Sequence, residues 1–252
     1  MRRIVATASL VFVLCFAAHD ALALNLGGPE MVIPVIGRFP GAGGTQWRTD
    51  VFLGNPYTPT ISATLRFYPS GGAVQTRTIA LAPFSTTSLP DIVLNTFGLQ
   101  NAGGALEVVS TEGLTINARA RIYNAGNAAG EFGQGVPGID RGYLNRQAYL
   151  YGLSGINGNR LTIGVTNPND TADQISLTVS DRNNVILHSR TFTLAPHAYV
   201  QFGDIFNTFP MPAQDGVVVQ FIASQNLIYG YASEVRNDTG DAVFLFGLSP
   251  NL

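Results

Sequence analysis

Cysteine and lysine are the two residue types that this sequence most clearly lacks. It contains a single cysteine, Cys15, and no lysine. Because Cys15 lies within an apolar N-terminal run that we expect to be removed, the remaining chain can form neither disulfide bonds nor thiolate metal sites. A hydrophobic core must therefore hold the protein together, which is feasible for units of about 110 residues. We interpret the missing lysines as a coding bias.

Charged residues of both signs are also scarce, at 12% of the chain. Without Arg2, Arg3 and Asp20, the 14 basic residues fall to 12 and the 16 acidic residues to 15, a formal charge of -3. A chain with this balance offers little basic surface to neutralise phosphate groups. We therefore expect no nucleic-acid partner.

Residues for catalysis or metal binding are sparse as well. The chain beyond residue 23 has two histidines, His188 and His197, whereas a zinc site needs three or four ligands. We expect His188 to face solvent on a strand and His197 to lie in a Leu-Ala-Pro turn. No serine stands in a Gly-x-Ser-x-Gly motif, and the acidic residues are scattered over turns and strand exteriors. These absences favour a protein that is not an enzyme and that uses no cofactor and no metal.

One acidic turn leaves the question of a metal open. Asp238, Thr239, Gly240 and Asp241 could offer oxygen ligands to calcium. The segment lacks the alternating ligands of an EF-hand loop, which favours an ordinary tight turn. The sequence does not decide whether the turn binds calcium.

The N-terminus has the pattern of a secretory signal peptide. Met1-Arg2-Arg3 precedes an apolar run over residues 4–18, and Ala21-Leu22-Ala23 supplies the small residues of a cleavage site. A membrane anchor is the rival interpretation, but an apolar run of this length falls short of the roughly 20 residues that cross a bilayer. We expect residues 1–23 to be the signal peptide and the mature protein to be secreted, periplasmic or at the cell surface.

A stretch of about one hundred residues recurs 112 to 113 positions later. Asn55-Pro56 aligns with Asn167-Pro168, and Leu81-Ala82-Pro83 aligns with Leu194-Ala195-Pro196. The same comparison aligns Asn124 with Asn237. A period this long indicates a duplicated domain. We expect the first unit at residues 24–140 and the second at residues 141–252.

Apolar and polar residues alternate with a period of two through much of both units. The pattern is clear over residues 61–68 and 114–123, and residues 227–235 are expected to repeat it with Tyr229 and Tyr231 on the core side. We count seven or eight strands in each unit, with turn signals every eight to twelve residues. This predicts an all-β protein of two tandem antiparallel β-sandwiches of immunoglobulin-like type.

Short helical turns are expected once in each unit. Asp91 and Asp204 each precede an apolar cluster, and an aspartate in that place can cap the free amides of a helix. We interpret both turns as plugs over one open end of each sandwich. Phe97 and Phe209 are then expected to be buried.

One surface of the first unit is a candidate binding face. If the third, sixth and seventh strands share a sheet, as in immunoglobulin domains, several polar side chains project from its outer side. Arginine and tyrosine are enriched in interface hot spots, which favours recognition there. The face comprises Arg66, Tyr68, Arg119, Arg121 and Tyr123, with Glu107 among them. Its duplicate is expected to differ, with Ala232, Glu234 and Arg236 at the last three positions.

The first unit resembles uncharacterised immunoglobulin-like repeats of exported bacterial proteins. The resemblance rests on the segment from Trp47 to Pro56, on Leu81-Ala82-Pro83, and on Ile122-Tyr123-Asn124 followed by residues 132–138. It covers most of both units, although residues 161–165 lack the tryptophan and aspartate of the first segment. The resemblance implies a tandem sandwich and no particular activity.

These observations favour an exported, non-enzymatic protein for adhesion, surface structure or recognition of a protein or glycan at the cell surface. The alternative is a periplasmic assembly chaperone, because pilus chaperones also consist of two immunoglobulin-like domains. Such chaperones bind a terminal carboxylate with a basic pair, and a chain without lysine lacks half of the usual pair. A hydrolase or metalloenzyme is the least favoured class.

Overall fold

A computed structural model describes residues 27–41, 44–126 and 130–249 of the chain. The expected signal peptide lies outside this part. Strands that pair in antiparallel sheets make up most of the described residues, and the all-β prediction is confirmed. Within these ranges, no helix combines the length and the apolar character that a bilayer crossing requires.

The first unit contains eight strands and one helical turn in its described part. They are β1 (Glu30–Pro40), β2 (Gln46–Asn55), β3 (Ile61–Pro69), β4 (Gln75–Leu81), β5 (Ser85–Leu89), α1 (Ile92–Asn95), β6 (Ala102–Ser110), β7 (Asn117–Asn124) and β8 (Phe132–Pro137). A two-residue strand, β9 (Ile139–Asp140), pairs with β1, and a 3-10 turn, η2 (Arg141–Tyr143), follows it. The chain passes from one unit to the other in this segment.

The second unit repeats the same series of elements. They are β10 (Gln147–Ser154), β11 (Asn159–Thr166), β12 (Asp173–Ser180), β13 (Ile186–Leu194), β14 (Tyr199–Phe202), α2 (Ile205–Thr208), β15 (Asp215–Ala223), β16 (Tyr229–Arg236) and β17 (Ala242–Phe246). Each strand from β1 to β8 therefore has a counterpart nine numbers later.

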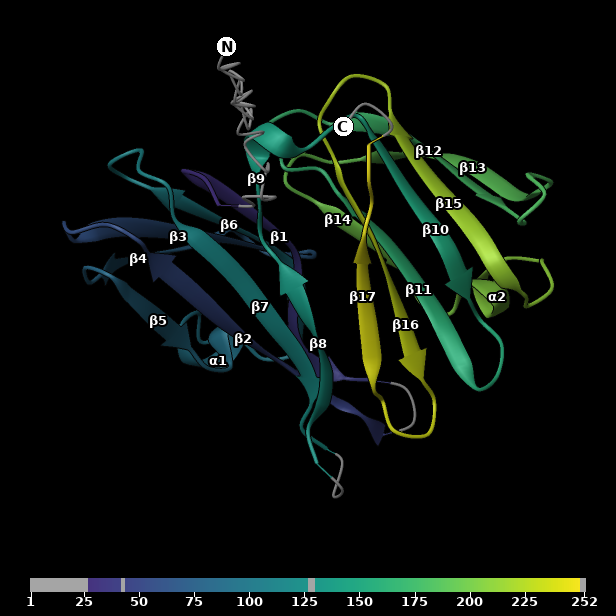
Figure 1. The fold of residues 1–252 in the computed structure, drawn as a ribbon, viewed down its shortest axis with the longest axis horizontal. Coiled ribbons are helices and arrows are strands. Elements are labelled where there is room, and N and C mark those ends of the chain that lie inside the picture. Colours follow the sequence, from purple (N-terminus) through teal and green to yellow (C-terminus); the bar gives the residue numbers. More distant parts are fainter. Residues whose placement is uncertain (1–26, 42–43, 127–129, 250–252) are drawn as a thin grey trace, which may run out of the picture.

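Each unit has two sheets with an apolar core between them (Figure 1). In the first unit these are sheet A, in the order β4-β3-β6-β1, and sheet B, in the order β5-β2-β7-β8. The end of β1 also pairs with the start of β2, so sheets A and B are joined there. In the second unit, sheet C (β10-β15-β12-β13) and sheet D (β14-β11-β16-β17) repeat this order.

The strand order corrects one premise of the sequence analysis. The third and sixth strands do share a sheet, but the seventh strand, β7, pairs with β2 in sheet B. In immunoglobulin domains the third, sixth and seventh strands lie in one sheet. The sandwich-like arrangement of antiparallel sheets stands, whereas the immunoglobulin-like type is not confirmed.

The two copies of the seventh strand are offset by 112 residues. Ala120 of β7 pairs with Val51, and Ala232 of β16 pairs with Ile163. Since Ile163 lies 112 residues after Val51, just as Asn167 follows Asn55, Ala232 is the counterpart of Ala120. The alignment of Asn124 with Asn237 is therefore wrong by one residue.

A shift of one residue turns every side chain of a strand to the opposite face. Tyr229 and Tyr231 were expected on the core side of the second sandwich, but they point away from it and pack against the core of the first unit. The counterparts of Arg119, Arg121 and Tyr123 are thus Tyr231, Ser233 and Val235, and not Ala232, Glu234 and Arg236.

Both helical turns are present, but the expected caps are not. Asp91 and Asp204 have left-handed backbones, with φ of 39° and 41°, and neither side chain caps a backbone N–H of the helical turn. The Asp91 carboxylate contacts Arg38 and Arg48 instead. Phe97 and Phe209 are buried as predicted, with 4% and 5% of their surface exposed.

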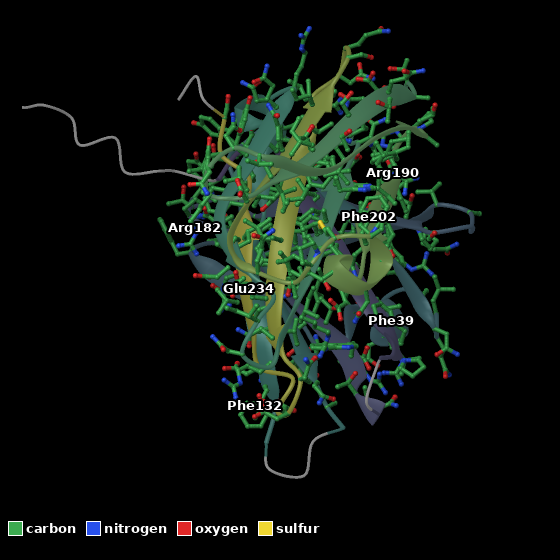
Figure 2. The ribbon with its side chains drawn as sticks, turned by 90° about the vertical axis from the view of Figure 1, so that its right-hand side faces the viewer. Phe39, Phe132, Arg182, Arg190, Phe202 and Glu234 are labelled. Carbon is green, nitrogen blue, oxygen red and sulfur yellow. The ribbon has the colours of Figure 1, made fainter. Side chains whose placement is uncertain are left out.

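Aromatic side chains close the second core beside α2. Phe202 meets Phe209 at 5.4 Å between ring centres, and the Arg190 guanidinium lies 5.3 Å from the centre of the Phe202 ring (Figure 2). His188 stacks on Phe209 at 4.0 Å and is half-buried. The expectation that His188 faces solvent is therefore wrong.

The two central strands of sheet D, β11 and β16, are buried on both faces. Ile163 and Ala232 pack into the core of the second unit, while Tyr229 and Tyr231, on the other face, are 2% and 1% exposed against the first unit. The Tyr229 hydroxyl donates to the Pro137 carbonyl at 2.9 Å. The two sandwiches therefore share one continuous packed interface.

Candidate functional site

The predicted binding face is divided between two sheets. Arg66 and Tyr68 lie on β3 of sheet A, where Arg66 is paired across the ladder with Glu107 of β6. Arg119, Arg121 and Tyr123 lie on β7 of sheet B. The structure brings together the members of each group, but it does not make one face of all five.

The group on sheet B is a network of paired side chains. The Arg119 guanidinium lies 4.2 Å from the centre of the Phe52 ring, and that of Arg121 lies 4.4 Å from the centre of the Tyr123 ring. Arg121 also contacts Glu131 at 2.9 Å and Asp50 at 3.9 Å. Because Arg121 is already paired with acidic side chains and Arg119 lies over an aromatic ring, the face is less available to a ligand than its composition indicates.

Burial and the nearby Asp50 carboxylate raise the pKa of Tyr123. The same carboxylate accepts the backbone N–H of Asp91 at 2.9 Å. Asp50 therefore fastens the start of α1 to β2. The counterpart of Asp50 in the second unit is Thr162, which is buried in the interface between the units. The contact that Asp50 makes with the start of α1 is therefore not repeated in the second unit.

The group on sheet A reaches across to the second unit. The Tyr68 hydroxyl donates to Glu107 at 3.0 Å, and the other Glu107 oxygen lies 2.9 Å from Nδ1 of His197. His197 stacks on Tyr68 at 4.3 Å, and its Nε2 lies 2.8 Å from Asp170. Burial and the Glu107 charge raise the pKa of Tyr68. This cluster joins the two units.

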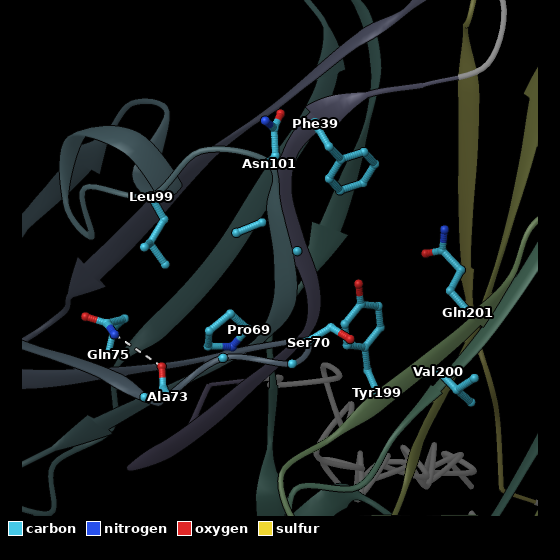
Figure 3. A pocket seen from close by; sticks show the side chains of 14 residues that line it. Phe39, Pro69, Ser70, Ala73, Gln75, Leu99, Asn101, Tyr199, Val200 and Gln201 are labelled. Carbon is cyan, nitrogen blue, oxygen red and sulfur yellow. Dashed lines mark hydrogen bonds between the residues drawn. The ribbon is translucent and has the colours of Figure 1, made fainter.

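A groove runs between the two units beside this cluster. Its volume is about 710 Å³, and strands and turns from both units line it (Figure 3). From the first unit come Phe39, Pro69, Ser70, Gly71, Gly72, Ala73, Gln75, Leu99, Asn101, Ala102 and Gly103. From the second unit come Tyr199, Val200 and Gln201 of β14.

Two aromatic residues, one from each unit, approach a glycine that lines this groove. A Cβ at Gly103 would stand 3.0 Å from both the Phe39 ring and the Tyr199 hydroxyl. Any side chain there would crowd both residues, so the glycine permits their close approach. Figure 3 shows Tyr199 extending from β14 toward Phe39, with Gln201 on the same side. The ring of Tyr199 also packs against the first core.

A second cavity adjoins the groove. It measures about 220 Å³ and shares Phe39 and Gln201 with the groove. Trp47, the single tryptophan of the chain, lines it together with Tyr231. The amide oxygen of Gln201 accepts the Tyr231 hydroxyl at 3.0 Å, which leaves its NH₂ group free to face the space.

The acidic turn near the C-terminus is held by its own hydrogen bonds. Asp238 pairs with Arg236 at 2.9 Å, and the Thr239 hydroxyl accepts the N–H of Asp241 at 3.0 Å. Gly240, with φ of 77°, closes the turn on the Arg236 carbonyl. In the described part of the chain, no group of three or more acidic, histidine or cysteine side chains could hold a metal ion.

Sequence reasoning missed the groove because its lining residues are scattered along the chain. One signal was available. Gly164 lies in the middle of β11, where a Cβ would collide with the ring of Tyr231. A glycine within a strand often marks a close approach of another group. Here the missing side chain of Gly164 leaves room for the Tyr231 ring in the interface between the units, beside which the groove lies.

Comparisons with known proteins give only weak structural likenesses. No family model and no curated protein match the chain. The crystal structure of Thermotoga maritima 1070 is similar over 45% of this chain and 95% of its own length, with a TM-score of 0.38 and 11% identity. A glycosyl hydrolase family 2 member from Bacteroides cellulosilyticus matches over 84% of this chain and 27% of its own, with a TM-score of 0.16 and 8% identity. Neither likeness is close enough to carry an argument.

Proposed function

We propose that this is an exported, non-enzymatic recognition protein that binds a protein or glycan of the cell surface in the groove between its two sandwiches. The observation that carries the proposal is the groove itself, which both units line and which has a volume of about 710 Å³. Binding sites are commonly concave and lie at domain interfaces, with volumes of about 300–1,000 Å³.

The rigidity of the walls supports this assignment. Tyr199 and Gln201 belong to sheet D, which is fixed to the first unit through the buried Tyr229 and Tyr231. A wall that is already in place loses little conformational entropy when a ligand binds. The Arg and Tyr face on sheet B is the competing site, and its internal ion pairs weigh against it.

One observation favours the assembly-chaperone alternative. β14 lies at the edge of sheet D and is paired there only with β11 in the described residues, so its other edge could accept a strand from a partner. The edge is short, because β14 has four residues. We therefore keep chaperone activity as the second candidate.

The proposal is tested by capturing partners from the surface fraction of the exporting cell with the mature protein. Ser70→Trp, at an exposed position of the groove, should abolish capture because the indole obstructs ligand entry into the groove. Arg119→Ser should leave capture unchanged. If Arg119→Ser abolishes capture and Ser70→Trp retains it, the binding site lies on sheet B and not in the groove. A captured pilin-like subunit with an unpaired strand would favour the chaperone.

Export is tested separately by N-terminal sequencing of the protein recovered outside the cytoplasm. We expect the mature chain to begin at Leu24, after the small residues of the expected cleavage site. A recovered chain that still begins at Met1 would contradict the signal-peptide assignment.

A further inference from the structure

We propose that the ligand of the groove is a neutral oligosaccharide, an inference that rests on the proposed function. The lining of the groove is uncharged. None of the 14 lining residues is charged, although arginines and acids lie close by in the His197 cluster. A phosphorylated, sulfated or strongly acidic ligand would have to leave water without a counter-charge, which is unfavourable.

The groove also offers hydrogen-bonding side chains. Ser70 and Asn101 are exposed in the groove, and no partner of either side chain is seen among the described residues. The Gln201 NH₂ adds two further donors. Amides and hydroxyls that both donate and accept suit a ligand covered with hydroxyl groups, each of which also does both.

Two aromatic residues also favour a sugar ligand. Phe39 and Tyr199 are half-buried, and both line the groove. A pyranose ring has a face of C–H bonds that packs on an aromatic ring while its hydroxyls point sideways. An apolar platform with amides around it therefore fits a sugar ring better than it fits a fully polar ligand.

The size and shape of the site extend the inference to more than one sugar ring. The volume of about 710 Å³ lies in the range that accommodates drug-sized ligands. The adjoining cavity at Trp47 shares Phe39 and Gln201 with the groove but is lined by the charged Arg160, so we expect the neutral ligand in the groove alone. An extended peptide is the less favoured occupant, because its main chain would depend on the four residues of β14 for pairing.

The experiment titrates the full mature protein with neutral hexasaccharides of glucose, mannose and N-acetylglucosamine, and with hexagalacturonate and an uncharged decapeptide. Binding is followed by calorimetry and by the fluorescence of Trp47, the single tryptophan. We expect saturable binding of at least one neutral hexasaccharide and of neither other ligand. Titration up to about 10 mM would reveal even a millimolar affinity.

Two variants locate the binding. Asn101→Gly removes the amide without strain, because Asn101 has a φ of 52°, and it should weaken binding about tenfold. The matched control is Asn184→Gly, at a φ of 65° in the turn between β12 and β13, which should bind as the wild type does. Ser70→Trp, followed by calorimetry alone because it adds a second tryptophan, should abolish binding with an unchanged melting temperature.

The outcomes separate the ligand class from the proposed function. If only hexagalacturonate or the peptide binds and Asn101→Gly weakens it, the groove is a recognition site but the ligand class is wrong. If no neutral hexasaccharide binds, the oligosaccharide inference is overturned, and the capture experiment with Ser70→Trp still tests the groove. If hexasaccharide binding is unchanged in both groove variants, the inference and the groove site both fail.

Discussion

Single residues explain why the two copies of the repeated sequence fit different surroundings, one exposed and one buried. Phe52 of β2 and Gly164 of β11 are counterparts, 112 residues apart. They occupy equivalent positions in the β2–β7 ladder and the β11–β16 ladder. Phe52 carries the Arg119 guanidinium on an outer face, whereas Gly164 leaves room for the Tyr231 ring. One change of side-chain size therefore separates a charged surface from a buried contact.

Asp173 gives a prediction at the scale of one residue. Its carboxylate is 4% exposed and accepts hydrogen bonds from the N–H groups of Gln225 at 2.9 Å and Asn226 at 2.6 Å and from the Ser224 hydroxyl. Burial raises the pKa of Asp173, but these hydrogen bonds outweigh it and leave the pKa lowered. Asp173→Asn turns an NH₂ group toward these donors and should lose about 1–3 kcal/mol at pH 7.

The pH dependence follows from the lowered pKa. The stabilisation by Asp173 is complete above the ordinary pKa of an unfolded aspartate, about 3.9, and is lost as the pH falls through the lower folded value. In urea titrations the difference between Asp173→Asn and the wild type should thus narrow below about pH 4. Asp215→Asn, in an exposed pair with Arg182, should change stability little at any pH. An equal loss in both variants would contradict the assignment.

At the scale of elements, α1 and α2 are turns fixed by their surroundings. They have four residues each, which is too short for a helix that is stable by itself. Ile92 and Val93 of α1 are buried, and Phe97 just beyond it packs on Phe67 at 5.2 Å between ring centres. The turn therefore exists because its apolar side chains fill one end of the sandwich.

Phe97→Ala should destabilise the protein by roughly 3 to 5 kcal/mol, the range for truncating a buried aromatic residue. Chemical denaturation of the mature chain measures it. Phe84→Ala is the matched control, because Phe84 is the same residue type in the same unit but is 70% exposed. A loss below about 1 kcal/mol for Phe97→Ala would show that the turn does not seal the core.

Strands were more predictable than the partners with which they pair. Alternation over residues 61–68 is a local signal, and β3 forms there. The pairing of β7 with β2 depends on residues some seventy positions apart, and no local pattern records it. In β16 both faces are buried, so the alternation of Tyr229 and Tyr231 with Gly230 and Ala232 did not distinguish core from interface.

At the scale of the whole molecule, the buried tyrosines of β16 predict that the two units unfold together. Tyr231 is 1% exposed, donates to Gln201 and stacks on Phe244 at 5.4 Å. Tyr231→Ala should cost roughly 3 kcal/mol or more and should divide one calorimetric transition into two. Tyr151→Ala, at a position 58% exposed, should keep a single transition near the wild-type temperature. Two transitions in the wild type would show that the interface does not couple the units.

The candidate site could be predicted only in part. Tyr68 and Arg66 were chosen from their alternation, and Tyr68 does lie at the boundary between the units beside His197. The groove itself depends on how sheet D meets the first unit, which brings Tyr199 of the second unit to Gly103 of the first. This contact forms only when the two units pack together, so the sequence of either unit alone does not predict it.

The interface through sheet D is also a head-to-tail contact between unlike surfaces, a geometry that can propagate into an open array unless one end is closed. The outer face of sheet B is the same surface in the first unit, but it carries Arg119, Arg121 and Tyr123 in place of Tyr231, Ser233 and Val235. Another copy of the chain would have to desolvate those paired charges to dock there. We therefore expect the arginines on this face to disfavour the docking of another copy of the chain.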